Sequence, residues 1–91
     1  MNHVELFAGI GGFRRAMDLI SQDLGLNIYT VAYSEIDRKA IDTYNANFDT
    51  TGELAMGDIV TFVNDKRAMR SLPRYQLLSG GFPCQTFSMM G

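Results

Sequence analysis

The stretch that decides the fold lies near the start of the sequence and reads Phe7-Ala8-Gly9-Ile10-Gly11-Gly12. It continues a short apolar-rich run, residues 3–7, which predicts a strand that ends in a tight glycine turn. Glycine has no Cβ, so the backbone of such a turn can come close to a ligand. The turn is therefore compatible with ligand binding, although a bare tight turn accounts equally well for the pattern.

A helix is expected directly after the turn. Apolar residues recur at spacings of three and four, which places them on one face of a helix over 12–24, and Gly25 supplies the stop. The residues of this apolar face are Phe13, Ala16, Met17, Ile20 and Leu24. The chain thus begins as a strand, a glycine turn and an amphipathic helix.

The rest of the chain alternates between strand and helix signals. The expected elements are a strand over 27–33, a helix from Asp37 as N-cap to 47–49, a strand over 53–56, a weakly periodic helix from 59 to 71–73, and a strand over 75–79. Alternating strands and helices predict an α/β fold with parallel strands in the order 3-2-1-4 and right-handed crossovers. Ligands of such folds bind at the carboxyl ends of the strands.

Composition excludes several classes of protein. The 91 residues can form one compact unit at most, and no apolar run reaches the roughly 18 residues that a membrane span needs. The first residues lack the basic segment and apolar stretch of a secretory signal, so the protein is expected in the cytoplasm. A single cysteine excludes an internal disulfide, and no cluster of Cys and His has metal-ligand spacing.

The charge balance argues against tight DNA binding by this chain alone. Eight Lys and Arg residues against ten Asp and Glu residues give a net charge of −2. A stand-alone DNA binder makes about 6 to 10 phosphate contacts, so nearly every basic residue would have to face the DNA. If DNA is the substrate, most of the DNA-binding surface is expected elsewhere.

Two carboxylates follow expected strand ends. Glu35 can accept hydrogen bonds from both ribose hydroxyls of an adenosine-containing cofactor, and with the glycine turn this interpretation outweighs a solvated carboxylate. Asp58 could accept from an adenine amino group, cap the next helix, or do both. Phe7 fits the face of an adenine ring or the core equally well. His3 has no predicted partner and is interpreted as a surface or strand histidine.

The sharpest signal in the sequence is Gly81-Phe82-Pro83-Cys84-Gln85-Thr86-Phe87-Ser88. A lone cysteine is more often a small buried apolar residue than a nucleophile. Cys84, however, follows a rigid proline in a loop at the carboxyl end of the expected fourth strand, beside the predicted cofactor site. Functional thiols lie in such positions, so Cys84 is the candidate nucleophile.

Residues 7–12 and 81–88 resemble the first and fourth conserved motifs of the DNA cytosine-5 methyltransferase family, in the family's order and spacing. Residues 34–48 are similar to its second motif, and Gly57-Asp58-Ile59 to its third. These motifs cover nearly the whole chain. The resemblance implies that residues 1–91 are the N-terminal part of a Rossmann-like S-adenosylmethionine-dependent methyltransferase domain, with an incomplete sheet and no target-recognition domain.

The resemblance also implies a cofactor and a reaction. The cofactor is S-adenosyl-L-methionine, with Glu35 on its ribose and Asp58 with Ile59 at its adenine. The other residues implied to lie around it are Phe7, Gly9, Ile10, Gly11, Gly12, Ile36 and Pro83. In the family's chemistry the thiolate, here Cys84, adds to C6 of a cytosine flipped out of double-stranded DNA, and C5 then takes the methyl group.

The sequence departs from the family's pattern in two ways. Gln76 stands where the family usually has an acidic residue. No Glu-Asn-Val segment, later arginine-bearing strand or target-recognition domain is present, so the chain alone is expected not to methylate DNA. The first hypothesis is a fragment or a subunit of a split enzyme, completed by a partner chain, self-association or domain swapping.

The alternatives are a catalytically incomplete S-adenosylmethionine-binding module, a nonfunctional truncation, and a relative that methylates cytosine in tRNA. The Phe82-Pro83-Cys84-Gln85 form looks more like the bacterial DNA enzymes than the tRNA enzymes. The target DNA sequence, the oligomeric state, and the choice between restriction–modification and regulation are not specified by these residues.

Overall fold

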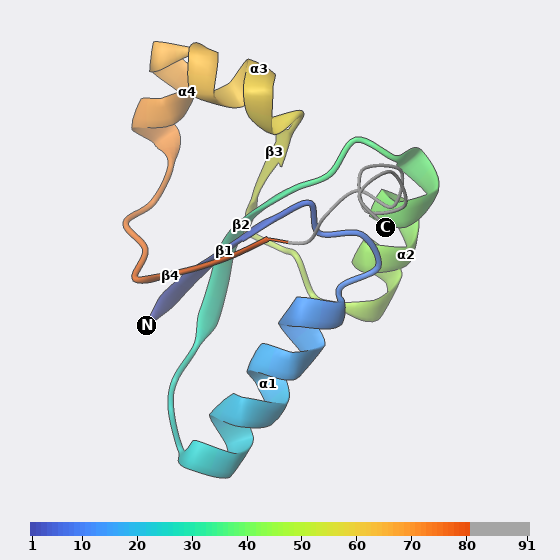
Figure 1. The fold of residues 1–91 in the computed structure, drawn as a ribbon, viewed down its shortest axis with the longest axis vertical. Coiled ribbons are helices and arrows are strands. Elements are labelled where there is room, and N and C mark those ends of the chain that lie inside the picture. The colour runs from blue at the N-terminus through green and yellow to red at the C-terminus, as the bar shows by residue number, and fades with distance from the viewer. Residues whose placement is uncertain (81–91) are drawn as a thin grey trace, which may run out of the picture.

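The computed structural model describes residues 1–80, which form the α/β fold expected from the sequence (Figure 1). Its elements are β1 (Asn2–Leu6), α1 (Gly12–Leu24), β2 (Tyr29–Ser34), α2 (Arg38–Asn47), β3 (Leu54–Gly57), α3 (Ile59–Asn64), α4 (Lys66–Ser71) and β4 (Leu77–Gly80). Residues 81–91 lie outside the described part of the chain, and the predicted loop of Pro83 and Cys84 lies there with them. Among the described helices, none is long and apolar enough to cross a membrane.

The four strands form one parallel sheet in the order β3-β2-β1-β4, which confirms the predicted order. The register places Leu6 of β1 opposite Gly80 of β4, and Ser34 of β2 opposite Gly57 of β3. The carboxyl ends of the strands therefore meet at one edge of the sheet. The glycine turn, Glu35 and Asp58 all follow at this edge.

Gln76, which departs from the family's pattern, has a structural role at the other edge. Asn2 N donates to Gln76 Oε1 at 2.7 Å, and Gln76 N donates to Asn2 O at 2.9 Å. The amide side chain thus continues the pairing of β1 with β4 by one more residue. A carboxylate could also accept from Asn2 N, so the substitution preserves this contact.

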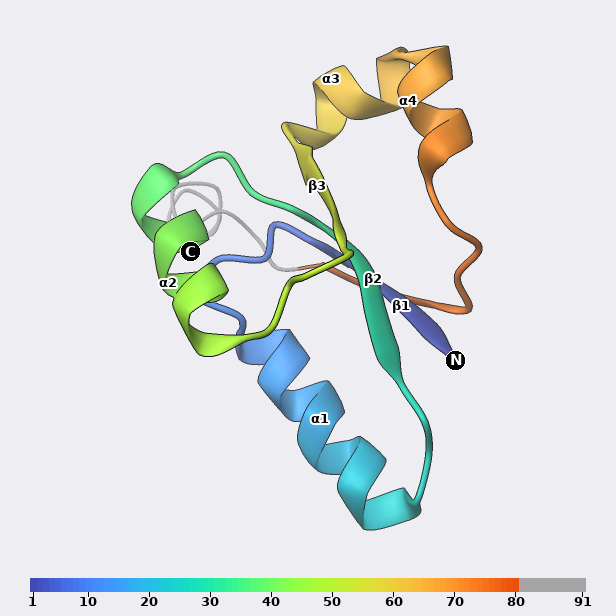
Figure 2. The same cartoon turned by 180° about the vertical axis from the view of Figure 1, so that it is seen from behind.

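An apolar core lies between one face of the sheet and the pair α3 and α4. Side chains alternate along β1, so Val4 faces this core while His3 and Glu5 face the opposite side. Figures 1 and 2 show α3 and α4 on the side of the sheet away from α1 and α2. The buried members of the core are Val4, Ala32, Met56 and Phe62, with Leu6, Val31, Leu54, Ile59, Ala68 and Leu72 packed around them.

The first helix is confirmed from Gly12 to Leu24, and Gly25 ends it in the left-handed region with a φ of 65°. Its apolar face, however, has little to pack against within residues 1–80. Phe13, Ile20 and Leu24 are exposed, and no residue of α1 is buried. The β1 side chains on this side, His3 and Glu5, are polar, and the apolar cluster of Ala8, Tyr33, Tyr44 and Phe48 includes no residue of α1.

The remaining helices follow the expected plan with one correction. Asp37 caps α2 as predicted, because its side chain accepts from Lys39 N at 3.3 Å. The single helix expected from 59 to 71–73 is wrong, since the chain breaks at Asp65 into α3 and α4. Asp65 Oδ1 accepts from Arg67 N at 3.0 Å and from Ala68 N at 3.1 Å, so its side chain starts a second helix.

Candidate functional site

The glycine turn leaves the end of β1 and lies beside the end of β2. Phe7 N donates to Ser34 Oγ at 3.0 Å, and Ala8 N donates to Ser34 O at 2.8 Å. Phe7 has a φ of 53°, a conformation that is uncommon for residues other than glycine. The bonds to Ser34 hold this strained backbone in place, at the point where the predicted cofactor site begins.

The glycines of the turn serve different purposes. Gly9 and Gly11 have φ values of 57° and 95°, in the left-handed region that favours glycine. A Cβ on Gly11 would overlap the ring of Phe48, so the C-terminal end of α2 packs directly on the turn. Among the atoms of residues 1–80, a Cβ on Gly12 would meet none within 4 Å, and one on Gly9 would meet only Phe7 O at 4.0 Å. Within this part of the chain the space over Gly9 and Gly12 is thus open to a ligand.

The Glu35 carboxylate lies against this turn. Its Oε1 accepts from Gly9 N at 2.7 Å, and its Oε2 accepts from Ile36 N at 2.9 Å and from Asp37 N at 3.0 Å. Glu35 is half-buried, so it is not the freely solvated carboxylate of the alternative interpretation. The structure therefore brings together the two features that the sequence linked to an adenosine-containing cofactor.

Three large apolar side chains around the turn are exposed. Phe7, Ile10 and Ile36 are 44 %, 67 % and 73 % exposed, although side chains of this kind are usually buried. Phe7 is therefore not a core residue within residues 1–80, and its contact with an adenine ring stays a prediction. An apolar rim beside a fixed carboxylate suits a ligand with one flat apolar face and one hydroxyl-bearing part.

Asp58 emerges beside Glu35, because the preceding residues Ser34 and Gly57 are partners in the sheet. Its side chain caps α3 by accepting from Val60 N at 2.9 Å, and it is exposed. The capping role is thus confirmed, and a second role toward a cofactor stays a prediction. Ile59 is half-buried and packs against the core under α3, so only part of its surface is available to a ligand.

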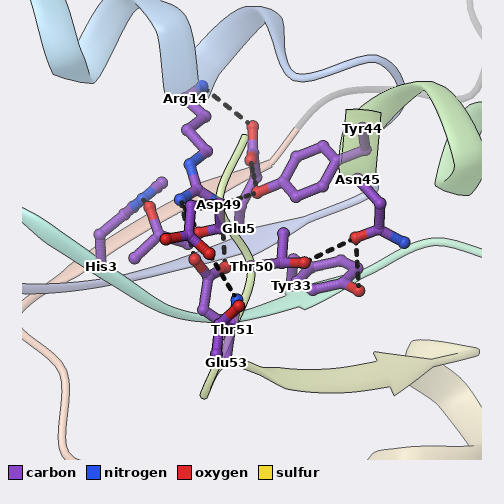
Figure 3. A network of polar contacts seen from close by, with 11 residues as sticks. His3, Glu5, Arg14, Tyr33, Tyr44, Asn45, Asp49, Thr50, Thr51 and Glu53 are labelled. Atoms are coloured by element: carbon purple, nitrogen blue, oxygen red, sulfur yellow. Dashed lines mark hydrogen bonds and ion pairs between the residues drawn. The ribbon is translucent and has the colours of Figure 1, made fainter. Parts of the chain in front are cut away.

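A buried polar cluster lies under the start of α1 and was not predicted (Figure 3). It consists of Glu5, Arg14, Tyr44 and Glu53 and is called the Arg14 cluster. Arg14 donates from Nη1 and Nη2 to both carboxylate oxygens of Glu53 at 2.8 Å, and from Nη1 to the Tyr44 hydroxyl at 3.1 Å. The Tyr44 hydroxyl in turn donates to Glu5 Oε2 at 2.9 Å.

Burial controls the electrostatics of this cluster. Removal from water raises the pKa of the Glu5 carboxyl and of the Glu53 carboxyl, and the hydrogen bonds from Tyr44 and Arg14 act in the opposite direction. Burial likewise raises the pKa of the Tyr44 hydroxyl, so it remains a donor at neutral pH. One signal was present in the sequence: Glu5 is a charged residue within an apolar strand, and such a residue requires partners when buried. Its partners could not be identified because they come from distant segments.

His3 is buried in β1 and has two hydrogen-bond partners that the sequence did not predict, so the interpretation as a strand histidine is confirmed and that as a surface histidine is wrong. Nδ1 is hydrogen-bonded to Thr30 Oγ1 at 2.9 Å and Nε2 to Ser79 Oγ at 2.7 Å, so the ring links β2, β1 and β4. Burial lowers the pKa of the imidazole, the charge of Arg14 lowers it further, and Asp18 acts in the opposite direction. His3 is therefore a neutral strand residue that connects three strands.

The whole chain, residues 1–91, matches the family model of C-5 cytosine-specific DNA methylases. The chain belongs to this family. It is 37 % identical over its full length to the type II methyltransferase M.HgiCI of Herpetosiphon aurantiacus. Over 97 % of its length it is 41 % identical to M.BanI of Aneurinibacillus aneurinilyticus and 40 % identical to M.NlaX of Neisseria lactamica, both type II methyltransferases. The chain covers 19 %, 18 % and 25 % of these relatives, about a fifth of their length.

Membership of the C-5 cytosine-specific DNA methylases confirms the resemblance and implies the use of S-adenosylmethionine. The described residues fit such a group in three respects. The space over Gly9 and Gly12 is open, Glu35 is fixed beside it, and apolar side chains surround it. Within residues 1–80 no group of His, Cys, Asp and Glu could hold a metal ion.

Proposed function

We propose that this chain is the cofactor-binding and nucleophile-bearing part of a DNA cytosine-5 methyltransferase. The observation that carries the proposal is the bond between Gly9 N and Glu35 Oε1 at 2.7 Å in a member of this family. It fixes an acceptor for ribose hydroxyls directly beside an open glycine turn. S-adenosylmethionine bound there supplies the methyl group, and double-stranded DNA in the cytoplasm supplies the cytosine.

Each residue of the proposed cofactor site has a separate task. Glu35 accepts from the ribose, Phe7 and Ile10 cover the apolar part of the nucleoside, and Asp58 accepts from the adenine amino group. An ionised carboxylate offers about four acceptor positions, and three backbone amides already donate to Glu35. Accepting both ribose hydroxyls therefore requires Glu35 to release one of these amides. Ile36, Ile59 and Pro83 complete the proposed surroundings of the cofactor.

Cys84 is the proposed nucleophile. It follows Gly80 by four residues, a separation that the length of the chain limits to about 14 Å, and Gly80 is paired with Leu6 at the start of the glycine turn. The thiolate would form a bond to C6 of the cytosine, and the electron pair of the former C5–C6 double bond would then bond the methyl group at C5, while the bond from this methyl group to the sulfonium sulfur of the donor breaks and leaves a thioether. Loss of the C5 proton and of the thiolate restores the ring. Cys84 makes this possible by turning one difficult substitution into two easier steps.

DNA binding by the whole enzyme requires more than this chain. The net charge of −2 leaves few cations for phosphate contacts, and the relatives are about five times as long as the part matched here. We therefore assign base flipping and target recognition to segments outside residues 1–91, supplied by the same enzyme or by a partner chain. The other assembly that we consider is a homo-oligomer or domain swap of this chain.

Calorimetric titration with S-adenosylmethionine tests the cofactor part of the proposal. We expect binding by the chain, and for Glu35→Gln an affinity at least about tenfold weaker, because the substitution removes a charged acceptor. Asp42→Asn is the matched control, since it makes the same change of charge at an exposed side chain of α2 whose ion pair, in the described part of the chain, is with Arg38. Equal affinities of the two variants would exclude Glu35 from the cofactor site.

A covalent trap tests the nucleophile. In the presence of the cofactor and a partner that supplies the missing segments, DNA containing 5-fluorocytosine should form an adduct with the chain that survives denaturation, because fluorine cannot leave as the C5 proton does. Cys84→Ser should form none. Cofactor binding without an adduct would favour the cofactor-binding module over the enzyme.

A further inference from the structure

The glycine turn is attached to α2 at both of its ends. At one end Gly9 N donates to Glu35, two residues before the cap of α2 at Asp37. At the other end the backbone of Gly11 lies against the ring of Phe48, which follows the last residue of α2. The position of α2 therefore sets the shape of the turn, and the contacts that hold α2 to the sheet become relevant to the proposed cofactor site.

The start of α1 lacks an ordinary N-cap. The capping residue is Gly11, which has no side chain to accept from the free amides of the first turn. Glu5 provides this acceptor from the neighbouring strand, because Arg14 N donates to Glu5 Oε1 at 3.2 Å. A buried carboxylate on β1 thus fixes the first turn of α1 directly behind the glycines.

Tyr44 connects these two attachments. Its hydroxyl donates to Glu5 Oε2 at 2.9 Å and accepts from Arg14 Nη1 at 3.1 Å, and its side chain is fully buried. The ring lies between Tyr33, at a centroid distance of 4.7 Å, and Phe48, at 5.1 Å. One hydroxyl of α2 therefore orients both the carboxylate that caps α1 and the guanidinium that projects from α1.

Arg14 completes the connection on the far side. Both of its terminal nitrogens bind Glu53, Nη2 also donates to Asp49 O at 3.3 Å, and its guanidinium lies 4.7 Å from the centre of the Phe48 ring. The segment between α2 and β3 is thereby held to the first turn of α1. Arg14 and Tyr44 thus join β1, α1, α2 and the approach to β3 behind the glycine turn, whose own contacts are with Ser34, Glu35 and Phe48.

We propose that Tyr44 and Arg14 are positioning residues for the methyl donor, which set the glycine turn and Glu35 in the geometry that binds it. This inference rests on the proposed function, since it assigns a task to residues that do not themselves touch the cofactor. It accounts for a feature that stability alone leaves unexplained: four buried polar side chains from β1, α1, α2 and the strand approach to β3 converge behind the turn. Apolar residues of similar volume would fill the same space with less dehydration of charge.

The test compares two variants that each remove one buried phenolic oxygen from the same aromatic stack. Tyr44→Phe removes the hydroxyl that joins Glu5 to Arg14. Tyr33→Phe is the matched control, because within residues 1–80 the Tyr33 hydroxyl donates only to Asn45 Oδ1, at 3.3 Å, outside the Arg14 cluster. Both rings keep their packing, and both variants are measured at a temperature where circular dichroism shows them fully folded.

Two quantities are measured, the dissociation constant for S-adenosylmethionine by calorimetry and the hydrogen exchange of the Gly9 and Arg14 amides by NMR. We expect Tyr44→Phe to bind about tenfold more weakly, and its Arg14 amide to exchange about tenfold faster, because the orientation of Glu5 is lost. Tyr33→Phe should stay within about twofold of the unaltered chain in both quantities. A merely structural role would lower the melting temperature of both variants without changing the affinity of the folded protein.

The failures are distinguishable. If the unaltered chain binds the cofactor and Tyr44→Phe binds it equally well, the positioning role is wrong and the proposed function stands. If the unaltered chain does not bind the cofactor, both the proposed function and this inference are wrong. Faster exchange at Arg14 with an unchanged dissociation constant would also overturn the inference, since the turn would then move without consequence for the ligand.

Discussion

The two faces of the sheet are built from alternate residues of the same strands and differ in kind. On one face Val4 and Ala32 meet Phe62 in an apolar core. On the other face His3 and Glu5 bind hydroxyl groups, and the Tyr44 hydroxyl that binds Glu5 also accepts from the Arg14 guanidinium, which pairs with Glu53. The face under α3 and α4 buries apolar surface, whereas the face under α1 and α2 orients its side chains through hydrogen bonds.

This difference shows that one face of the sheet mainly stabilises the fold and that the other face positions the residues of the candidate site. Apolar contacts are not directional, so they tolerate small shifts of α3 without consequence for the site. Hydrogen bonds require a given distance and angle, and each buried group that loses its partner costs free energy. Among residues 1–80 no buried side-chain nitrogen or oxygen lacks a partner. The polar face therefore holds the glycine turn to one arrangement.

The largest expected effect is on the apolar face. Phe62→Ala should lower the free energy of unfolding by about 3 to 5 kcal/mol, because it leaves a cavity in the core. The cofactor affinity of the fraction that remains folded should change by less than about twofold, since Glu35 and the glycine turn are not members of this core and Ile59 lies at its border. Urea denaturation and calorimetry measure the two quantities. Val63→Ala, at the exposed neighbour, is the control and should change stability by less than about 0.5 kcal/mol.

A smaller loss of stability is expected on the polar face. Glu53→Gln should cost about 2 kcal/mol, because the buried guanidinium of Arg14 loses a charged partner at 2.8 Å but keeps its bonds to Tyr44 and to Asp49 O. Asp42→Asn breaks an exposed pair with Arg38 and should cost less than about 1 kcal/mol. Equal losses in the two variants would show that the Arg14 cluster contributes no more than a surface ion pair.

The sequence predicted the helices and strands whose ends are set by residues close by along the chain. Gly11 and Gly25 delimit α1, the spacing of its apolar residues gives its length, and Asp37 begins α2, all within a few neighbours along the chain. The strand order followed from the alternation of elements, because right-handed crossovers leave few arrangements. The placement of Glu35 and the glycine turn at the same edge of the sheet was predicted on the same ground, since both follow the carboxyl ends of parallel strands.

What the sequence did not predict depends on partners that are distant along the chain. The Arg14 cluster joins residues 5, 14, 44 and 53, and no spacing rule relates such positions. His3 looked isolated because Thr30 and Ser79 become its neighbours only when three strands pair. The break at Asp65 was missed for a different reason: an aspartate inside a weak helical pattern indicates equally a surface residue and a new cap.

His3 is expected to make the free energy of unfolding depend on pH. Its pKa is lowered from 6.5 by burial and by Arg14 on α1, with Asp18 of the same helix opposing, so the folded state favours the neutral ring. Its contribution to stability is therefore complete above pH 6.5 and is lost as the pH falls toward the folded pKa. One such proton can change the free energy of unfolding by at most about 1.4 kcal/mol per pH unit.

Chemical denaturation between pH 7.5 and 5.5 checks this, with His3→Gln as the variant that cannot titrate. The pKa values of Glu5 and Glu53 are raised, so their contributions are lost as the pH rises and have the opposite sign. The two carboxyls are present in both proteins, and the difference between the two slopes isolates the histidine. A variant whose stability falls as steeply as that of the unaltered chain would show that His3 is not the group responsible.

The smallest expected effect separates the two roles of Asp58. Asp58 and Asp65 cap successive short helices in the same way, each accepting backbone amides through Oδ1, so either aspartate replaced by alanine should cost about 1 kcal/mol. Only Asp58 follows a strand end beside Glu35, and only Asp58→Ala should also weaken S-adenosylmethionine binding. Asp58→Ser, which preserves a capping oxygen but not the charge, should recover the stability and not the affinity. If Asp58→Ser recovers both the stability and the affinity, Asp58 acts only as the cap of α3. If Asp58→Ala binds the cofactor with unchanged affinity, the polar contacts to the cofactor come from Glu35 and the glycine turn.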